Sequence, residues 1–329
     1  MSTTQVDAVL SFDELDASPS PLEHAPDDIT VEQGFLRMPQ KIHAVAIVVI
    51  PLAGTIAAIW LAIVNGMTWL DIGLLAFMYA VSMLGISVGY HRHFSHRSFK
   101  ATSPISVALA IAGSTAAQGS VSYWVANHRR HHQYTDRPGD IHSPYFDDDR
   151  EMKIVEGFWH SHMGWTFNHR MTNTLKFAKD LYRNPPIATA NKLYYVWVLG
   201  GLFVPLAIGG LVTQTWYGAL TGFLWGGLVR IFLCYHFTNG IDSVTHIFGS
   251  QPFKTADYSR NNAWWALPTM GEGWHNNHHA FPSSAIFGLR WWELDFGAWL
   301  IRGLQSVGLA WDVNEASPTM MAAKQRARS

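Results

Sequence analysis

The stretch "IHAVAIVVIPLAGTIAAIWLAIV", residues 42–64, contains no Asp, Glu, Lys or Arg, and it decides the fold class. An α-helix rises about 1.5 Å per residue, so about 20 apolar residues cross the ~30 Å of hydrocarbon in a bilayer. Similar runs occupy residues 69–90, 193–212 and 217–238. The sequence therefore predicts an all-α integral membrane protein with four transmembrane helices.

The four runs pair into two hairpins with very short connections. The first connection reads NGMTW and the second reads TQTW, and neither contains a Lys or an Arg. Because basic residues concentrate on the cytosolic side of membrane proteins, we expect both hairpin tips to face outward. Both chain ends and all remaining segments then lie on the cytosolic side, at the inner membrane if the chain is bacterial.

The composition agrees with a membrane protein and argues against several other classes. Of the 329 residues only 14% are charged, against about 25% in soluble domains. Fifteen residues are tryptophans, which favour membrane–water interfaces. The net charge of −1 gives no reason to expect nucleic-acid binding. The single cysteine, Cys234, excludes a disulfide framework and a thiolate metal cluster.

The two ends of the chain differ in character from its middle. The first 33 residues hold eight acidic and no basic residues, which is the opposite of a signal peptide. We expect residues 1–38 to form a disordered acidic cytosolic tail and residues 314–329 to form a C-terminal tail. Residues 39–313 are the predicted membrane domain, whose cytosolic helical cap comprises residues 91–192 and 239–313.

A further apolar stretch, residues 103–125, needs its own interpretation. It is only moderately hydrophobic, contains Ser, Gly and Thr, and has Gln118 within it. If it crossed the membrane, the histidine clusters on its two sides would face opposite compartments. We therefore predict an interfacial or protein-buried helix rather than a fifth crossing.

Seventeen histidines are present, and most gather in four places. Three boxes read HRHFSH, HRRHH and HNNHH, and the fourth place is the single histidine of SVTH. Together they supply nine candidate metal ligands: His91, His96, His128, His131, His132, His246, His275, His278 and His279. All nine fall on the cytosolic side of the predicted spans, so they can meet. We expect His93 to point away from the metal, and four loop histidines to be solvated or hydrogen-bonded: His142, His160, His162 and His169.

The spacing within the boxes suits metal binding. Residues i, i+3 and i+4 of a helix share a face, so the histidines of HRRHH and of HNNHH can each converge. His91 and His96 lie about 140° apart on an ideal α-helix, so either a helix end separates them or they bind different metals. Nine imidazoles suit two ions with four or five nitrogens each, drawn from Zn, Cu, Fe or Ni. A structural or proton-relay role stays open for each box taken alone.

A metal site beside a bilayer favours chemistry on a lipid. Zinc would favour hydrolysis, but zinc cannot change its oxidation state, and the protease motif H-E-x-x-H is absent from the sequence. Redox-active iron with O2 can attack an unactivated C–H bond, and a dry protein tunnel shields the oxidant.

Four segments resemble the membrane fatty-acid desaturases of the stearoyl-CoA (Δ9) type: "GYHRHFSHRSFKA", "HRRHHQYTD", "SVTH" and "GEGWHNNHHAFP". The similarity covers about residues 40–312. It implies a four-span helical protein with a cytosolic cap and a non-haem di-iron centre. It also implies O2 as the oxidant and electrons that arrive one at a time.

Carried over by position, the resemblance makes the nine histidines the ligands of two iron ions. It assigns Gln118, Trp124 and Thr238 to the wall that bends the acyl chain at the irons. A single bend presents one CH2–CH2 pair, so the chain length above the bend sets the position of the double bond. Blocking residues on the first two spans then set the acyl length.

Two positions depart from the family pattern. Four residues before His246 the family usually has Asn, which reaches a metal through water, whereas this chain has Asp242. We expect Asp242 either to keep that role through water or to ligate iron directly. Two polar or charged residues that contact CoA in the animal enzymes fall at Ala126 and Asn127. An acyl-lipid or an acyl-carrier protein is therefore an alternative to acyl-CoA as the substrate.

The resemblance also implies a separate electron donor. No haem, flavin or iron–sulfur motif accompanies the core, so a cytochrome b5 or a ferredoxin with its reductase is expected. Basic residues beside the boxes are candidates to dock an acidic donor or phospholipid head groups, with plain solvation as the alternative: Arg92, Arg97, Lys100, Arg129 and Arg130.

The sequence thus predicts an O2-dependent di-iron acyl desaturase that introduces a cis double bond, at Δ9, into acyl-CoA or acyl-lipid. A membrane fatty-acyl or alkane hydroxylase is the nearest alternative, although alkane-type hydroxylases usually space the first box as H-x3-H. His91 and His96 instead give H-x4-H. The other alternative is a non-enzymatic metal- or haem-binding membrane protein, whose polar ligands would lie near the bilayer midplane.

Overall fold

A computed structural model describes residues 27–31 and 34–326, and most of the regular structure there is helical. The elements of the first half are η1 (Asp27–Ile29), α2 (Gly34–Asn65), α3 (Trp69–Leu84), η2 (Gly85–Ser95), β1 (Lys100–Ala101), α4 (Ser103–Thr115), α5 (Val121–Tyr134), β2 (Phe146–Asp147), β3 (Arg150–Glu151), α6 (Ile154–Trp159), η3 (His160–Gly164) and α7 (Trp165–Asn168). Those of the second half are α8 (Thr174–Phe177), α9 (Lys179–Tyr182), α10 (Pro185–Lys192), α11 (Tyr194–Thr213), α12 (Trp216–Gly222), η4 (Phe223–Val229), α13 (Arg230–Val244), α14 (Ala263–Ala266), α15 (His275–Ala280), α16 (Phe296–Ser306), β4 (Ala310–Trp311) and α17 (Pro318–Lys324). The short strands form two antiparallel pairs, β1 with β4 and β2 with β3.

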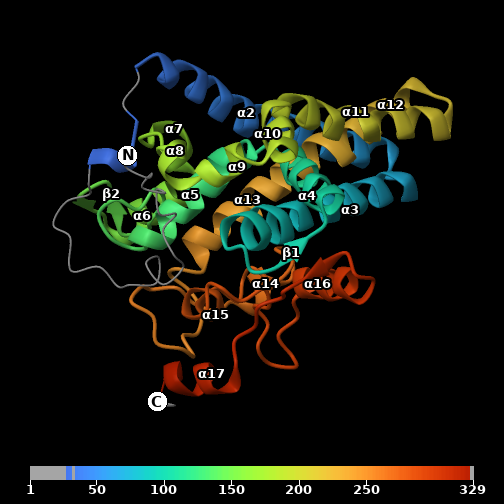
Figure 1. Ribbon diagram of the computed structural model, residues 1–329. Coiled ribbons are helices and arrows are strands. Elements are labelled where there is room, and N and C mark those ends of the chain that lie inside the picture. The colour runs from blue at the N-terminus through green and yellow to red at the C-terminus, as the bar shows by residue number, and fades with distance from the viewer. Residues whose placement is uncertain (1–26, 32–33, 327–329) are drawn as a thin grey trace, which may run out of the picture.

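Four helical stretches are long and apolar enough to cross a membrane: Met38–Asn65, Trp69–Ser95, Tyr194–Thr213 and Trp216–Val244. They confirm the predicted fold class. Large apolar side chains such as Phe77 (63% exposed) and Leu211 (70% exposed) cover their outer faces. Lipid, rather than water, is the environment that such faces require. Both hairpin connections lie at one end of the molecule and the cap lies at the other (Figure 1).

The stretch predicted to be a buried or interfacial helix contains α4, which at 13 residues is too short to span a membrane. It packs against η2 and α11, and its Ala110 is fully buried. A Cβ on Gly85 of η2 would lie 2.1 Å from the backbone nitrogen of Gly113, so only glycine permits this helix crossing. Ala117 and Gly119, both with positive φ, then turn the chain into α5. Within the described residues the stretch therefore makes no fifth crossing.

The second span continues beyond its predicted end at residue 90, because it becomes the π-helix η2 and runs to Ser95. The N–H of His96 donates to the carbonyl of His91 at 3.1 Å, which is an i→i+5 hydrogen bond. A π-turn holds more residues than an α-turn, so residues five apart face nearly the same way. We expected a helix end between His91 and His96, or two different metals. The helix does end between them, at Ser95, and the nitrogens of both rings belong to the same group, so the structure agrees with the first alternative.

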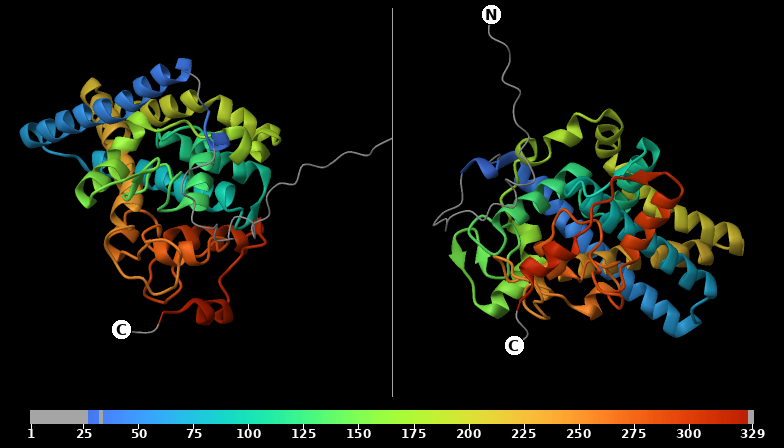
Figure 2. Two further views of the ribbon diagram at one scale, coloured as in Figure 1. Left: turned by 90° about the vertical axis from the view of Figure 1, so that its left-hand side faces the viewer. Right: turned by 60° about the horizontal axis from the view of Figure 1, so that its bottom comes forward.

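The structure describes only parts of the two predicted tails. Residues 1–26, 32–33 and 327–329 lie outside the described part. Ile29 is buried in the main core cluster, and α2 begins at Gly34. The segment 314–326 includes α17, and its Met321 packs against an apolar cluster of the cap. Burial of these apolar side chains favours packing of both segments onto the cap. The helix α17 lies far from the hairpin connections (Figure 2).

Candidate metal centre

The nine predicted histidines converge in two groups of ring nitrogens, with one nitrogen from each residue and all nitrogens of a group within 4.8 Å of one another. The first histidine group is His91, His96, His128, His132 and His278. The second histidine group is His131, His246, His275 and His279. Pairs of Nε2 atoms face each other at 2.8 Å (His96 and His128), 2.9 Å (His132 and His278) and 2.9 Å (His246 and His275).

Two short helices, α5 and α15, each contribute histidines to both groups. On α5, His128 and His132 reach the first group, while His131 reaches the second. On α15, His278 reaches the first group, while its i+1 neighbour His279 reaches the second. The spacing predicts that the histidines of HRRHH and of HNNHH each share one helix face, and they do, but that face lies between the two groups and contributes histidines to both of them.

Carboxylates that we did not predict orient four of the nine rings. The pairs are His91 with Glu272, His131 with Asp140 (3.0 Å), His246 with Asp136 (2.9 Å) and His279 with Asp257 (2.9 Å). In each pair the Nδ1–H donates to the carboxylate, which leaves the Nε2 lone pair directed into the group. The only signal in the sequence is proximity, since acidic residues closely follow the second box and precede the third.

Electrostatics favour neutral rings in most of the centre. Burial, followed by the neighbouring imidazoles, lowers the pKa of five histidines well below 6.5: His96, His128, His132, His275 and His278. Neutral imidazole is the form that ligates a metal. His246 is different, because its carboxylate partner Asp136 outweighs the effect of burial and raises the pKa to about 9. A cation at this site would have to displace that proton.

The residues present fit a metal ion in each group. Within the described residues, the buried Nε2 atoms of His131 and His279 have no hydrogen-bond partner. Neither group contains a carboxylate oxygen. A cluster of nitrogens alone suits transition metals that prefer imidazole, whereas Mg²⁺ and Ca²⁺ prefer oxygen.

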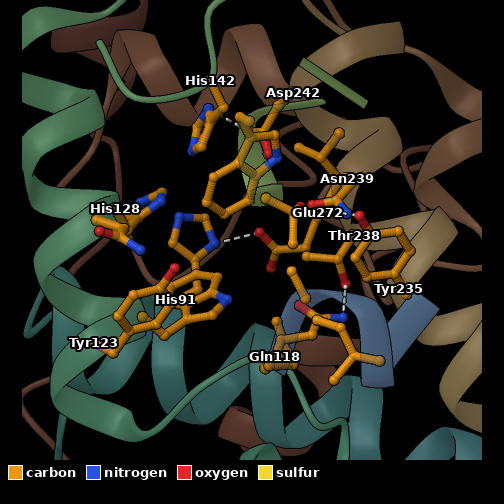
Figure 3. Close-up of a pocket in the computed structure, with 18 of the residues that line it drawn as sticks. His91, Gln118, Tyr123, His128, His142, Tyr235, Thr238, Asn239, Asp242 and Glu272 are labelled. Carbon is orange, nitrogen blue, oxygen red and sulfur yellow. Dashed lines mark hydrogen bonds and ion pairs between the residues drawn. The ribbon is translucent and has the colours of Figure 1, made fainter. Parts of the chain in front are cut away.

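A cavity of about 920 Å³, which includes the space at its mouth, leads to both groups. His91 and His128 of the first group line it, as does His275 of the second. The predicted substrate residues Gln118, Trp124 and Thr238 also line it, and Gln118 lies beside Thr238 (Figure 3). Gln118 donates from Nε2 to Thr238 Oγ1 at 3.0 Å, and Trp124 stacks on the ring of His128 with centroids 5.1 Å apart.

Asp242 lines the same cavity but belongs to neither group of converging nitrogens. Its carboxylate lies 3.6 Å from Nδ1 of His142 (Figure 3). This position agrees better with action through water than with direct ligation. His142 is only 6% exposed, which corrects our expectation of a solvated loop histidine. Its Nδ1 has no hydrogen-bond partner among the described residues, and its ring lies 4.6 Å from that of His131. The loop covers the second group because Asp136 and Asp140 tie it to His246 and His131.

The remaining polar residues of η2 serve the fold. His93 turns away from both groups, as predicted, and bonds Ser106 Oγ at 2.9 Å. The segment GISVG, residues 85–89, matches the hydrolase pattern G-x-S-x-G. It lies within a π-helix rather than in a strand-to-helix turn, and Ser87 donates to Glu272.

Three of the basic residues proposed to dock a donor are buried. Arg92 is fully buried and pairs with Asp295 at 2.9 Å. Arg129 is 8% exposed and pairs with Asp180, while Arg130 is 2% exposed and donates to the Gly139 carbonyl. The prediction is therefore wrong for these three, because a guanidinium in the cap interior satisfies internal acceptors. Arg97 and Lys100 do reach the surface, where Asp180 and Asp312 neutralise them.

These features define a class: a helical membrane protein with a polyhistidine candidate metal centre beside an open cavity. The family model described as "Fatty acid desaturase" matches residues 67–311. The chain therefore belongs to the fatty acid desaturase family, whose members are oxidoreductases that act on fatty acyl chains. The resemblance inferred from the four histidine segments is confirmed.

Individual relatives match most of the chain. A hex-5-enoyl-[acyl-carrier protein] acetylenase of Moorena producens (strain JHB) is 45% identical over 300 residues, 91% of this chain and 94% of that protein. The Delta-9 acyl-lipid desaturase 1 of Arabidopsis thaliana is 37% identical over 254 residues, 75% of this chain and 76% of that protein. An sn-1 stearoyl-lipid 9-desaturase of Synechocystis sp. is 36% identical over 258 residues, 78% of this chain and 76% of that protein.

Proposed function

We propose that this protein is an O2-dependent acyl desaturase that holds one iron ion in each histidine group and introduces a cis double bond into a saturated fatty acyl chain. One observation carries the proposal: nine imidazoles converge at the end of a cavity whose wall includes Gln118, Trp124 and Thr238. Membership of the desaturase family supports the class of reaction.

The proposed reaction converts one CH2–CH2 pair into CH=CH. Two hydrogen atoms from the chain, together with two external electrons and two protons, reduce one O2 to two water molecules. Iron held by the histidines would supply the O2 activation that imidazole alone lacks. The residues of the cavity select the bond: the Gln118–Thr238 hydrogen bond fixes one wall beside His91, and Trp124 presents a flat apolar surface. Such a wall orients the chain and excludes water.

The double-bond position is proposed to be Δ9. Two relatives whose names specify a Delta-9 or 9-desaturase support this position. The 45% identical acetylenase favours a second candidate, in which an alkene carried on an acyl-carrier protein becomes an alkyne. A hydroxylase that keeps one oxygen atom in the product remains the third possibility.

The head group of the substrate is proposed to be a lipid or an acyl-carrier protein rather than CoA. Ala126 is fully buried, and Asn127 is 5% exposed and lines the cavity. Neither residue supplies a charge to a nucleotide phosphate. The names of the relatives, which include acyl-lipid and acyl-carrier-protein enzymes, point the same way.

Electrons are proposed to come from a separate one-electron carrier, either a cytochrome b5 or a ferredoxin with its reductase. The cap would face the cytosol, where such carriers operate, and the hairpin tips would face the opposite side of the membrane. Arg97 and Lys100 are the exposed members of the basic set proposed for docking, and each is already paired with an acid.

Expression in an unsaturated-fatty-acid auxotroph, together with a ferredoxin and its reductase, tests the proposal. Lipid-bound and carrier-bound acyl chains are analysed separately by mass spectrometry with localisation of the double bond. A new alkene supports desaturation, whereas an alkyne or an alcohol identifies the second or third candidate. A His275→Ala variant serves as the inactive control.

Two results would contradict the proposal. The first is saturated product alone from iron-loaded protein with a competent donor. The second is an active enzyme that contains no bound iron, which metal analysis of the purified protein detects. A protein that binds iron or haem but leaves every acyl chain unchanged would instead match the non-enzymatic alternative.

A further inference from the structure

The cap exposes an unusual number of large apolar side chains on one part of its surface. Trp264 is 88% exposed, Trp291 is 95% exposed and Trp299 is 58% exposed. Together with their exposed neighbours they form what we call the tryptophan face: Trp264, Leu267, Trp291, Trp292, Leu294 and Trp299. Soluble surfaces rarely leave such residues in water unless they contact a partner or a membrane.

A buried tryptophan links the elements that carry the tryptophan face. Trp274 lies 5.7 Å from the ring of Trp292, and its Nε1 donates to the Leu294 carbonyl at 2.8 Å. Trp274 also packs in one apolar cluster with Ala266 of α14. The buried ring therefore joins α14 to the segment 291–294, which leads directly into α16.

The elements that carry this face are fastened to the membrane spans. Trp265 of α14 donates from Nε1 to the Phe237 carbonyl in the fourth span at 3.0 Å. Ile301 of α16 is buried in one cluster with Val88 of the second span. In Figure 1, α16 lies below α3 and β1 and closer to the hairpin tips than α14 or α15. The elements of the face are therefore attached directly to the second and fourth membrane spans.

We propose that the tryptophan face is embedded in the leaflet next to the cap, at the level of the lipid head groups. It is a membrane contact additional to the four spans. Tryptophan prefers this interface because its ring is apolar and its N–H remains hydrated. Arg290 lies over the ring of Trp292 at 5.6 Å and pairs with Glu293 at 3.6 Å, and Arg302 on α16 pairs with Glu315 at 2.7 Å. Both guanidinium groups are partly exposed, so lipid phosphates would compete with these carboxylates for them.

This contact would also position part of the metal centre. Asp295, the residue that caps α16, pairs with Arg92 at 2.9 Å. Arg92 in turn donates to Glu272 at 3.3 Å, and Glu272 accepts from His91. Lipid that holds α16 in place would therefore also fix this series of paired charges, which orients His91 of the first group. The proposal does not depend on which reaction the protein performs.

Depth measurements with single-cysteine variants test the proposal. The only native cysteine, Cys234, is fully buried, so Trp291→Cys and Trp299→Cys can each carry one nitroxide label. The protein is placed in lipid nanodiscs, and collision of the label with O2 and with a water-soluble nickel complex is measured. O2 concentrates in lipid, so both labels are expected to show a several-fold higher ratio of O2 to nickel accessibility than a Lys153→Cys label on the exposed start of α6.

A Phe77→Cys label on the second span gives the reference for full lipid contact. Labels at 291 and 299 that match the Lys153→Cys label would show that water covers the face, and this result would overturn the proposal. Labels shielded from both O2 and nickel would overturn it as well, because protein would then be the occupant. As a second readout, Trp291→Asp with Trp299→Asp is expected to lose iron to a chelator faster than Lys153→Asp.

Discussion

At the scale of single residues, the carboxylates behind the rings matter as much as the histidines. Asp136 accepts hydrogen bonds from His246, from the Tyr258 backbone at 2.9 Å and from Ser143 at 3.1 Å. One side chain thus fixes a ring, a loop and the segment before the third box. Partners of this kind typically control metal affinity without touching the metal.

Asp136→Asn is expected to lower metal affinity by about 10–100-fold, because the amide presents its NH2 or a weaker acceptor to His246. Asp136 has a φ of 56°, which asparagine tolerates, so the backbone is not strained by the change. Iron retained after dialysis against graded chelator concentrations measures the effect, with Asp147→Asn on strand β2 as the matched control. Equal retention in the two variants would show that Asp136 has no such role.

Asp242→Ala separates the two roles proposed for this residue. A role through water predicts nearly full iron content with turnover reduced by about tenfold or more, whereas direct ligation predicts loss of iron as well. Metal analysis and turnover are measured on the same preparation, beside Asp242→Asn, which restores the usual residue of the family. Full iron and full turnover in the alanine variant would contradict both roles.

At the scale of elements, the crossing of η2 over α4 sets the geometry of the first box. Gly85→Ala places a Cβ 2.1 Å from the Gly113 backbone nitrogen, so the two helices must separate. We expect a loss of stability of about 1–3 kcal/mol. Gly73→Ala in α3 is the control, because nothing lies within 4 Å of its added Cβ. Thermal unfolding in detergent compares the two variants, and equal midpoints would contradict the argument.

A second link joins α5, the helix of the second box, to α9. Asp180 binds Arg129 at 2.7 Å and Arg97 at 2.6 Å. Burial would raise the pKa of Asp180, but the two guanidinium groups outweigh it and hold that pKa below its usual value. A depressed carboxyl pKa stabilises the fold above the pKa of the unfolded chain, about 4, and the stabilisation disappears as the pH falls through the folded value.

Asp180→Asn should therefore be less stable than the natural chain at pH 7, by about 1–3 kcal/mol. The difference should begin to shrink as the pH falls below about 4, where the carboxyl takes up a proton in the unfolded chain, and it should disappear as the pH falls through the lower pKa of the folded state. Unfolding midpoints in detergent at a series of pH values measure this. A difference that stays constant down to pH 3 would exclude the Asp180 pair as its source.

At the scale of the whole molecule, the proposed topology puts the hairpin connections and the cap on opposite sides of the membrane. The connection between α2 and α3, which contains Met67, and α6, which directly follows Lys153, lie at opposite ends of the structure (Figure 1). In intact cells a membrane-impermeant maleimide is expected to label Met67→Cys but not Lys153→Cys, which should react only after lysis. The buried Cys234 contributes little background. The reverse pattern would invert the proposed topology.

Much of this architecture could be predicted because its causes are local. The span "IHAVAIVVIPLAGTIAAIWLAIV" needs no partner to be recognised, since its length and lack of charge already require a lipid environment. The three boxes are equally local, because their histidines are close in the chain. The positions of Glu272, Asp257 and His142 beside the histidine groups were not predicted, because single acidic or loop residues produce no periodic pattern in the sequence.

The sequence by itself determined the four spans, the desaturase family and the nine histidines of the centre. Only the tertiary structure assigned His131 and His132 to different groups, turned η2 into a π-helix and buried Arg92 between two acids. The physical reason is the distance along the chain between the residues that interact. Hydrophobic length and helical spacing are properties of neighbouring residues, whereas the direction of a ring and the partner of a charge depend on side chains up to two hundred positions away, which only packing brings together.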